Sequence, residues 1–236
     1  MSFVLTLSNN GRRVAIAALL LLVAPAVLSA HGVSSRDAAF VASVTGPAPV
    51  PFAYLGAKHM VTGYDHLLFL VGVIFFLYRV PDVVKYVSLF TLGHSVTLLA
   101  GVLGDIRANP FLIDAVIGAS VVYKGFENIG GFKAVFGVEP DTKVAVLVFG
   151  LFHGFGLATK LQELSLPTRG LVANLVSFNV GVEFGQFLAL AFVLIALAVW
   201  RSRASFGRHA FAANTALMTG GFLLVGYQLA GYFVAQ

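Results

Sequence analysis

Residues 171–200 have the sequence LVANLVSFNVGVEFGQFLALAFVLIALAVW, in which Glu183 is the only ionisable residue. A helix needs about 20 mainly apolar residues to cross a bilayer core about 30 Å thick. This stretch is longer, so we expect a span that tilts or extends beyond the lipid. Five other stretches have the same character, at residues 59–78, 83–103, 111–129, 143–160 and 210–233. The sequence therefore predicts an all-α, polytopic membrane helix bundle with about six transmembrane helices.

The composition agrees with lipid as the main solvent of this chain. Hydrophobic residues make up 58% of the chain and charged residues 11%, and the mean hydropathy is +0.91. The absence of cysteine excludes disulfides and thiolate ligands, so any metal must rest on nitrogen and oxygen. The net charge of +5 comes from Lys and Arg scattered between apolar runs, which indicates topology signals rather than a nucleic-acid partner.

The N-terminal region predicts export. Residues 1–30 hold a basic start, an apolar run at residues 14–23 and a small pair at Ser29 and Ala30, the layout of a cleavable signal peptide. Cleavage after Ala26 and retention as an extra helix are the alternatives. Residues 31–57, with three prolines, predict an extended exported segment, and residues 58–236 the six-helix transmembrane domain.

The expected orientation places the mature N-terminus outside. Under that topology the inner loops carry seven Lys or Arg residues and the outer segments five, and the strongest inner cluster is Arg201, Arg203 and Arg208. This bias agrees with the positive-inside rule. No phosphate-binding loop of the Gly-x-x-x-x-Gly-Lys-Ser/Thr type occurs in the sequence, so we expect no ATPase activity of the chain itself.

The first predicted span opens with His59, followed by Asp65 and His66. Seven residues make about two helical turns, so the two histidines should share one face of a continuous helix. Imidazole nitrogen and carboxylate oxygen suit divalent transition metals, and Asp65 could instead orient an imidazole. Polar residues bonded at a helix interface are the plainer alternative.

Four more of the ionisable residues inside predicted spans are functional candidates, because such residues are costly in lipid. His94 and His153 each fall near the middle of a span, and each alone is equally compatible with a bond to a backbone carbonyl. Glu127 could bind metal or pair with Lys124. Glu183 shares a helical face with Asn179 and Gln186, which we expect to point into the bundle. The predicted metal residues are thus His59, Asp65, His66, His94, His153, Glu127 and Glu183.

These motifs resemble the HupE/UreJ family, which consists of small integral membrane proteins associated with hydrogenase and urease systems and regarded as nickel permeases. The resemblance covers the first five spans. It rests on His59 with Asp65-His66, on FTLGHS at 90–95, on YKGFEN at 123–128, on FHG at 152–154 and on FNVGVE at 178–183. It implies metal passage along His59, Asp65, His66 and His153, a place in a bacterial inner membrane, and partners that mature metalloenzymes. Where many members have glutamate after His-Gly, this chain has Phe155-Gly156.

The leading hypothesis is a divalent transition-metal permease and not an enzyme, with Ni²⁺ favoured by the resemblance. The ligand types leave Co²⁺, Cu²⁺, Zn²⁺ and Fe²⁺ open, and the oligomeric state is open too. The alternatives are an intramembrane zinc-dependent hydrolase and a metal-binding accessory protein that does not transport. A permease should place polar groups at several depths, whereas a hydrolase should gather them into one closed site with a base such as Glu183.

Overall fold

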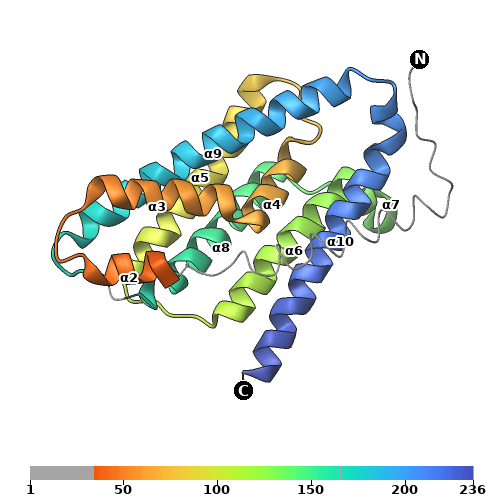
Figure 1. Ribbon diagram of the computed structural model, residues 1–236. Helices are drawn as coiled ribbons and strands as arrows, with labels where there is room; N and C mark the ends of the chain where they lie inside the picture. The colour runs from red at the N-terminus through yellow and green to blue at the C-terminus, as the bar shows by residue number, and fades with distance from the viewer. Residues whose placement is uncertain (1–34, 165, 236) are drawn as a thin grey trace, which may run out of the picture. The chain divides into compact units, whose positions relative to one another are not determined.

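The computed structural model describes residues 35–164 and 166–235, and the predicted signal peptide lies outside them. The described residues form helices and no strand, which confirms the all-α helix bundle (Figure 1). The helices are α2 (Ser35–Ser43), α3 (Pro49–Thr62), α4 (Tyr64–Ile74), α5 (Val80–Leu103), α6 (Pro110–Asn128), α7 (Gly131–Phe136), α8 (Thr142–Gln162), α9 (Leu171–Arg201) and α10 (Ser205–Val234).

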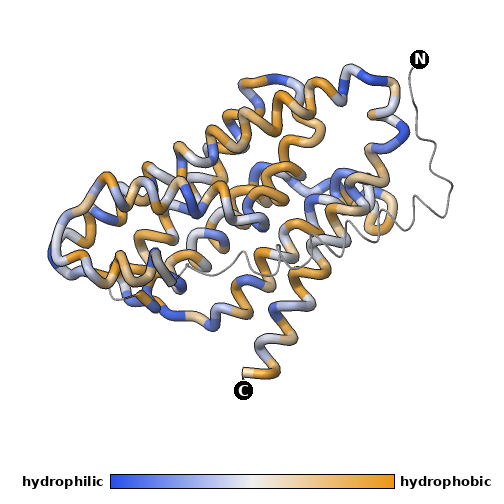
Figure 2. The backbone as a smooth tube through the Cα atoms, viewed as in Figure 1, coloured by the Kyte–Doolittle hydropathy of each residue, from blue (hydrophilic) through white to orange (hydrophobic). Residues whose placement is uncertain are grey.

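Four of the described helices, α5, α8, α9 and α10, are long and apolar enough to cross a membrane. Helix α6 is long enough but carries Asp114, Lys124 and Glu127, and α4 is apolar but short. Figure 2 shows hydrophobic residues along most of each long helix, with hydrophilic residues mainly at helix ends and loops. The chain is therefore a multi-pass membrane protein, and the count of six spans stays a prediction.

The first predicted span is wrong as one continuous helix. The chain breaks at Gly63, where φ is −76° and ψ is 89°, so that α3 ends and α4 begins on either side of it. The Gly63 amide still donates to the His59 carbonyl at 2.8 Å, and its own carbonyl accepts from Leu67 at 3.1 Å. Glycine suits this position because a side chain would press on the His59 carbonyl and the His66 ring.

The extended segment predicted before residue 58 is also wrong for the described residues. Residues 35–43 form α2, and α3 begins at Pro49, before the predicted first span. Pro49 and Pro51 lie in the first turn of α3, where the amide hydrogen that proline lacks has no intrahelical partner anyway. Prolines there start a helix rather than prevent one.

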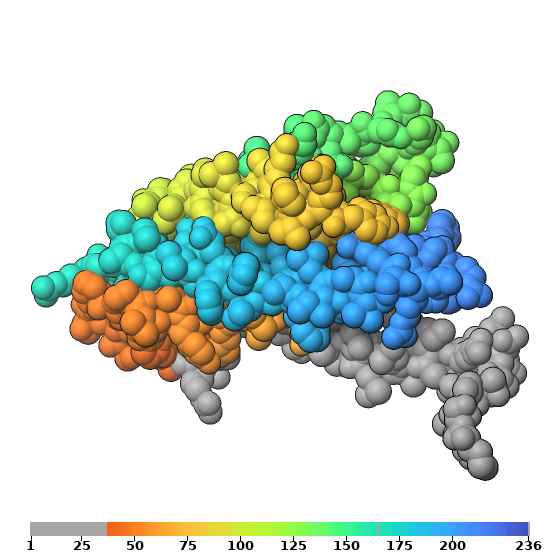
Figure 3. Space-filling view, turned by 90° about the horizontal axis from the view of Figure 1, so that it is seen from above, coloured from red at the N-terminus to blue at the C-terminus, as the bar shows by residue number. Residues whose placement is uncertain are grey.

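Six helices pack as three tight pairs: α3 with α9, α5 with α8, and α6 with α10. Glycines lie at each contact. A methyl group at Gly181 would collide with the Ala53 carbonyl, one at Gly154 with the His94 carbonyl, and one at Gly221 with Val122. Small residues allow membrane helices this close approach. Figure 3 shows α9 between α3 and α5.

Helix α4 contacts members of all three pairs. Its C-terminal end is held by Arg201 at the end of α9, whose guanidinium donates to the carbonyls of Leu77 at 2.9 Å, Ile74 at 2.5 Å and Phe75 at 2.7 Å. These carbonyls belong to the end of α4 and the turn after it, where the helix leaves acceptors unsatisfied. The broken helix is thus fixed at one end by Arg201, and its other end carries Asp65 and His66.

Candidate metal centre

Four histidines from four helices lie together, with His66 in the middle and the other three around it. The ring centroid of His66 lies 4.8 Å from that of His153, 5.3 Å from that of His59 and 5.8 Å from that of His94. Helices α3, α4, α5 and α8 supply one ring each. His66, His94 and His153 are buried, at 3%, 1% and 0% exposure. We call His59, Asp65, His66, His94 and His153 the histidine centre.

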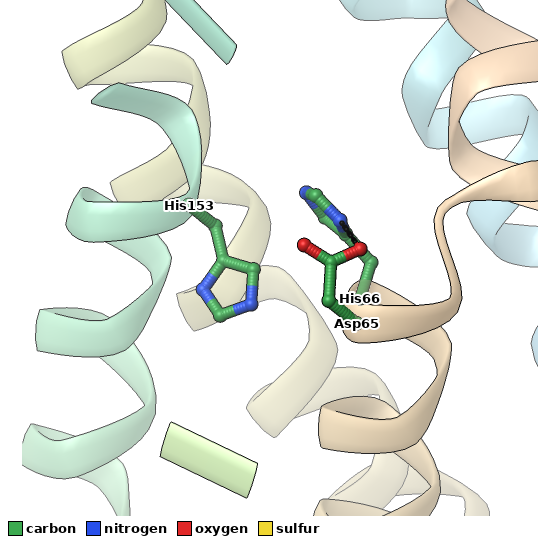
Figure 4. A group of neighbouring side chains, drawn as sticks. All are labelled: Asp65, His66 and His153. Atoms are coloured by element: carbon green, nitrogen blue, oxygen red, sulfur yellow. Dashed lines mark hydrogen bonds and ion pairs between the residues drawn. The ribbon is translucent and has the colours of Figure 1, made fainter. Parts of the chain in front are cut away.

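Asp65 controls which nitrogen of His66 can bind a metal. Its Oδ1 lies 3.0 Å from His66 Nδ1, and both side chains are almost fully buried in the first turn of α4 (Figure 4). The positive end of the helix dipole at this turn stabilises a carboxylate. A carboxylate that accepts from Nδ1–H leaves the Nε2 lone pair to act as ligand. Nε2 of His66 is buried and makes no hydrogen bond to another described residue.

The tautomer of His153 follows from its backbone partner. His153 Nδ1 lies 2.7 Å from the carbonyl oxygen of Phe149, one turn earlier in α8. A carbonyl can only accept, so Nδ1 carries the hydrogen and Nε2 carries the lone pair. A hydrogen bond to a backbone carbonyl was the alternative to a metal role for His153. The same bond leaves the Nε2 lone pair that a metal ligand needs, so the two roles are compatible.

Asp65, His66 and His153 each offer one ligand atom, and these atoms lie within 4.8 Å of one another. Figure 4 shows His153 on α8 facing the Asp65–His66 pair across the space between the two helices. An ion with bonds of about 2.1 Å holds two ligands at most about 4.2 Å apart. Binding to all three would therefore draw together any two of these atoms that lie further apart than that.

Buried aromatic rings pack against the histidine centre. Phe90 lies 5.0 Å from the His153 ring and 6.2 Å from that of His94, and Phe69 lies 5.4 Å from His153, measured between centroids. Both phenylalanines are fully buried. A low-dielectric surrounding strengthens the attraction between Asp65 and a cation. Neither ring nitrogen of His94 bonds another described residue, so His94 can add a further ligand.

The grouping of His59 and His66 was predicted correctly, but the reason was wrong. The two histidines lie on different helices, and the break at Gly63 brings their rings together. His94 and His153, expected as a separate station further along a path, contact the same centre through His66. Five of the seven predicted residues thus form one cluster.

Glu127 lies away from this cluster, in an ion pair. Its Oε2 accepts from Lys124 Nζ at 2.8 Å, and its Oε1 accepts from the Thr142 hydroxyl. The pairing that was left open for Glu127 is therefore present. Glu127 also lines a polar cavity of about 290 Å³ beside α7, together with Lys133 and Glu139. A hydrogen bond from Lys133 lowers the pKa of the Glu139 carboxyl.

Glu183 does not point into the bundle as predicted. Asn179 and Gln186 are buried, whereas Glu183 is exposed and lines a groove of about 570 Å³ between α5 and α9. The groove is otherwise mostly apolar. Gln186 closes its inner wall by accepting from Thr91 at 3.3 Å. The described carboxylate that lies within ligand distance of histidines is Asp65, not Glu183.

A second buried polar cluster lies outside the predicted site residues. Asp114 on α6 accepts from Lys160 on α8 at 2.8 and 3.0 Å and from Gln228 on α10 at 3.4 Å. Lys160 ends the predicted span at residues 143–160 and was counted only as one of the five outer Lys and Arg residues. The signal was present: Asp114 is a carboxylate inside an apolar helix, which by itself marks a functional candidate.

The family model for the HupE / UreJ protein matches residues 35–236. The match spans every described helix, and the chain belongs to the HupE/UreJ family. Membership gives it an accessory or transport-related role in nickel or cobalt handling at a membrane. No curated protein and no solved structure matches the chain. A buried cluster of histidine and aspartate that could bind a metal ion is consistent with that role.

Proposed function

We propose that the protein is a permease for a divalent transition metal, with Ni²⁺ preferred, in a bacterial inner membrane. The observation that carries the proposal is the histidine centre, in which Asp65, His66 and His153 present buried ligand atoms within 4.8 Å of one another. Imidazole and carboxylate ligands suit Ni²⁺ and Co²⁺. The family match supports nickel or cobalt as the cargo.

Polar groups at three levels of the bundle support passage rather than storage. The histidine centre is the middle level. Asp114 with Lys160 lies near the end where α6 begins and α8 ends, and Glu127 with Lys124 lies near the opposite end of α6. Membrane interiors tolerate such groups where they are paired or line a path.

Ligand chemistry favours transient binding. Neutral imidazoles give up a metal more readily than thiolates, and the chain has no cysteine. Asp65 supplies the negative charge that offsets part of the ion's loss of water.

Metal uptake by proteoliposomes tests the proposal. The parental protein should take up Ni²⁺ or Co²⁺ in preference to Zn²⁺ and Fe²⁺, and His66→Ala should abolish uptake, because His66 contacts every other ring of the centre. His209→Ala is the matched control: His209 is exposed on α10, and its Nδ1 lies 2.9 Å from the Ser205 carbonyl oxygen, the kind of bond that His153 makes to Phe149. Equal uptake by His66→Ala and His209→Ala would refute the proposal.

The same panel addresses the intramembrane hydrolase. The gathering of four histidines into one site is the observation that favours it, since a hydrolase needs one closed centre. It also needs a nearby base, and Glu183, the residue expected for that task, lines the groove between α5 and α9 instead. Tight Zn²⁺ binding by a protein that moves no metal would favour the hydrolase.

A further inference from the structure

Asp114 is a buried carboxylate that holds a cation inside the bundle. Its two carboxylate oxygens lie 3.0 and 2.8 Å from the Lys160 ammonium, and Gln228 donates to Oδ2 at 3.4 Å. The partners come from α8 and α10, and Asp114 itself is 5% exposed. The cation in this site is one that the chain supplies itself.

The cluster shares a face of α8 with His153, about two helical turns further along the helix. His153, Gly156 and Lys160 follow one another at three and four residues and share a helical face. A Cβ atom at Gly156 would lie 3.6 Å from Asp114 Oδ1, and closer still to Ile113 and Ile117. The two isoleucines therefore form an apolar seal at Gly156, about one turn from His153.

Lys160 is placed to leave Asp114 again. It lies in the last turn of α8, and its side chain is 15% exposed against 5% for that of Asp114, so the ammonium lies on the more open side of the pair. A lysine near a helix end can extend its stem and place the ammonium at the membrane surface. A buried carboxylate without a cation is costly, so a departing ammonium must be replaced.

We propose that Asp114 is a second cation station, which Lys160 closes with its ammonium until a divalent ion displaces it on the way to or from the histidine centre. This rests on the proposed function and adds a gate to it. No bond other than the ion pair changes. The Asp114 carboxylate exchanges the Lys160 ammonium for a divalent metal ion, and Gln228 keeps its position.

Equilibrium binding of Ni²⁺ to the full-length protein in detergent tests the station. Lys160→Met removes the ammonium and keeps the stem, so it should bind one more equivalent of Ni²⁺ than the parental protein. Adding Asp114→Asn should remove that equivalent. Lys133→Met is the matched control, because Lys133 pairs with Glu139 at 2.8 Å on the surface. No added equivalent, or one that survives Asp114→Asn, would overturn the station.

Uptake by Lys160→Arg tests the gate independently and does not depend on the folding of Lys160→Met. A guanidinium holds a carboxylate through two parallel hydrogen bonds, so uptake should slow several-fold while Ni²⁺ binding at the histidine centre stays unchanged. Uptake at the parental rate would mean a purely structural ion pair. Failure of the permease proposal looks different, because Ni²⁺ binding by the parental protein would then not depend on His66.

Discussion

A single hydrogen bond that Asp65 accepts from His66 decides the chemistry of the His66 ring. Asp65→Asn keeps an acceptor of the same shape but removes the charge. A partner of this kind is worth about 10–100-fold in metal affinity, so the variant should bind Ni²⁺ that much more weakly in a calorimetric titration. Asp105→Asn, at an exposed carboxylate bonded to Arg107, should bind as the parental protein does. Equal affinities for the two variants would reduce Asp65 to a structural role.

At the residue scale, the sequence indicates which ionisable residues lie close together better than it indicates how they are oriented. Five ionisable residues inside spans converge, as their cost in lipid predicts. Glu183 does not, because a four-residue step turns a helix about 40° past a full turn. It therefore lies at the edge of the buried face that holds Asn179 and Gln186. Whether a residue at that edge faces the bundle interior or a groove depends on how the neighbouring helices pack, which periodicity does not predict.

At the scale of elements, the break between α3 and α4 could not be predicted from hydropathy. Residues 59–78 are compatible with one helix, and Gly63 breaks it only because α3 pairs with α9 while α4 contacts helices of all three pairs. The glycines of the three pairs allow the close packing of their helices. Pro49 and Pro51 led to the wrong prediction of an extended segment. Proline breaks a helix in its interior but is favourable in its first turn, and the sequence pattern did not show that α3 begins at Pro49.

Arg201 at the end of α9 fixes the C-terminal end of α4. Arg201→Ala removes the donors that hold the end of α4, and hydrogen bonds to a charged group are each worth about 1.5–3 kcal/mol. We expect a lower unfolding temperature and weaker Ni²⁺ binding, because α4 carries Asp65 and His66. Arg203→Ala removes an exposed arginine two residues later and should change neither property. Thermal unfolding followed by fluorescence, with and without Ni²⁺, compares the two variants.

At the scale of the whole molecule, composition alone predicted the class, since 58% hydrophobic residues require lipid. Orientation and the signal peptide stay predictions. The chain has no cysteine, so single cysteines can report orientation. Asp105→Cys, between α5 and α6, should react with an impermeant maleimide from the periplasmic side, and Ala204→Cys, between α9 and α10, only after the membrane is opened. The reverse pattern would invert the predicted topology.

The central claim is that the histidine centre binds the transported metal. X-ray absorption spectroscopy of Ni²⁺ bound to the purified full-length protein tests it most directly, because imidazole rings give a characteristic outer-shell scattering. We predict nitrogen and oxygen ligation with at least two imidazoles, and loss of this signal in His66→Ala but not in His209→Ala. Bound Ni²⁺ without imidazole ligands, or an unchanged spectrum in His66→Ala, would contradict the account.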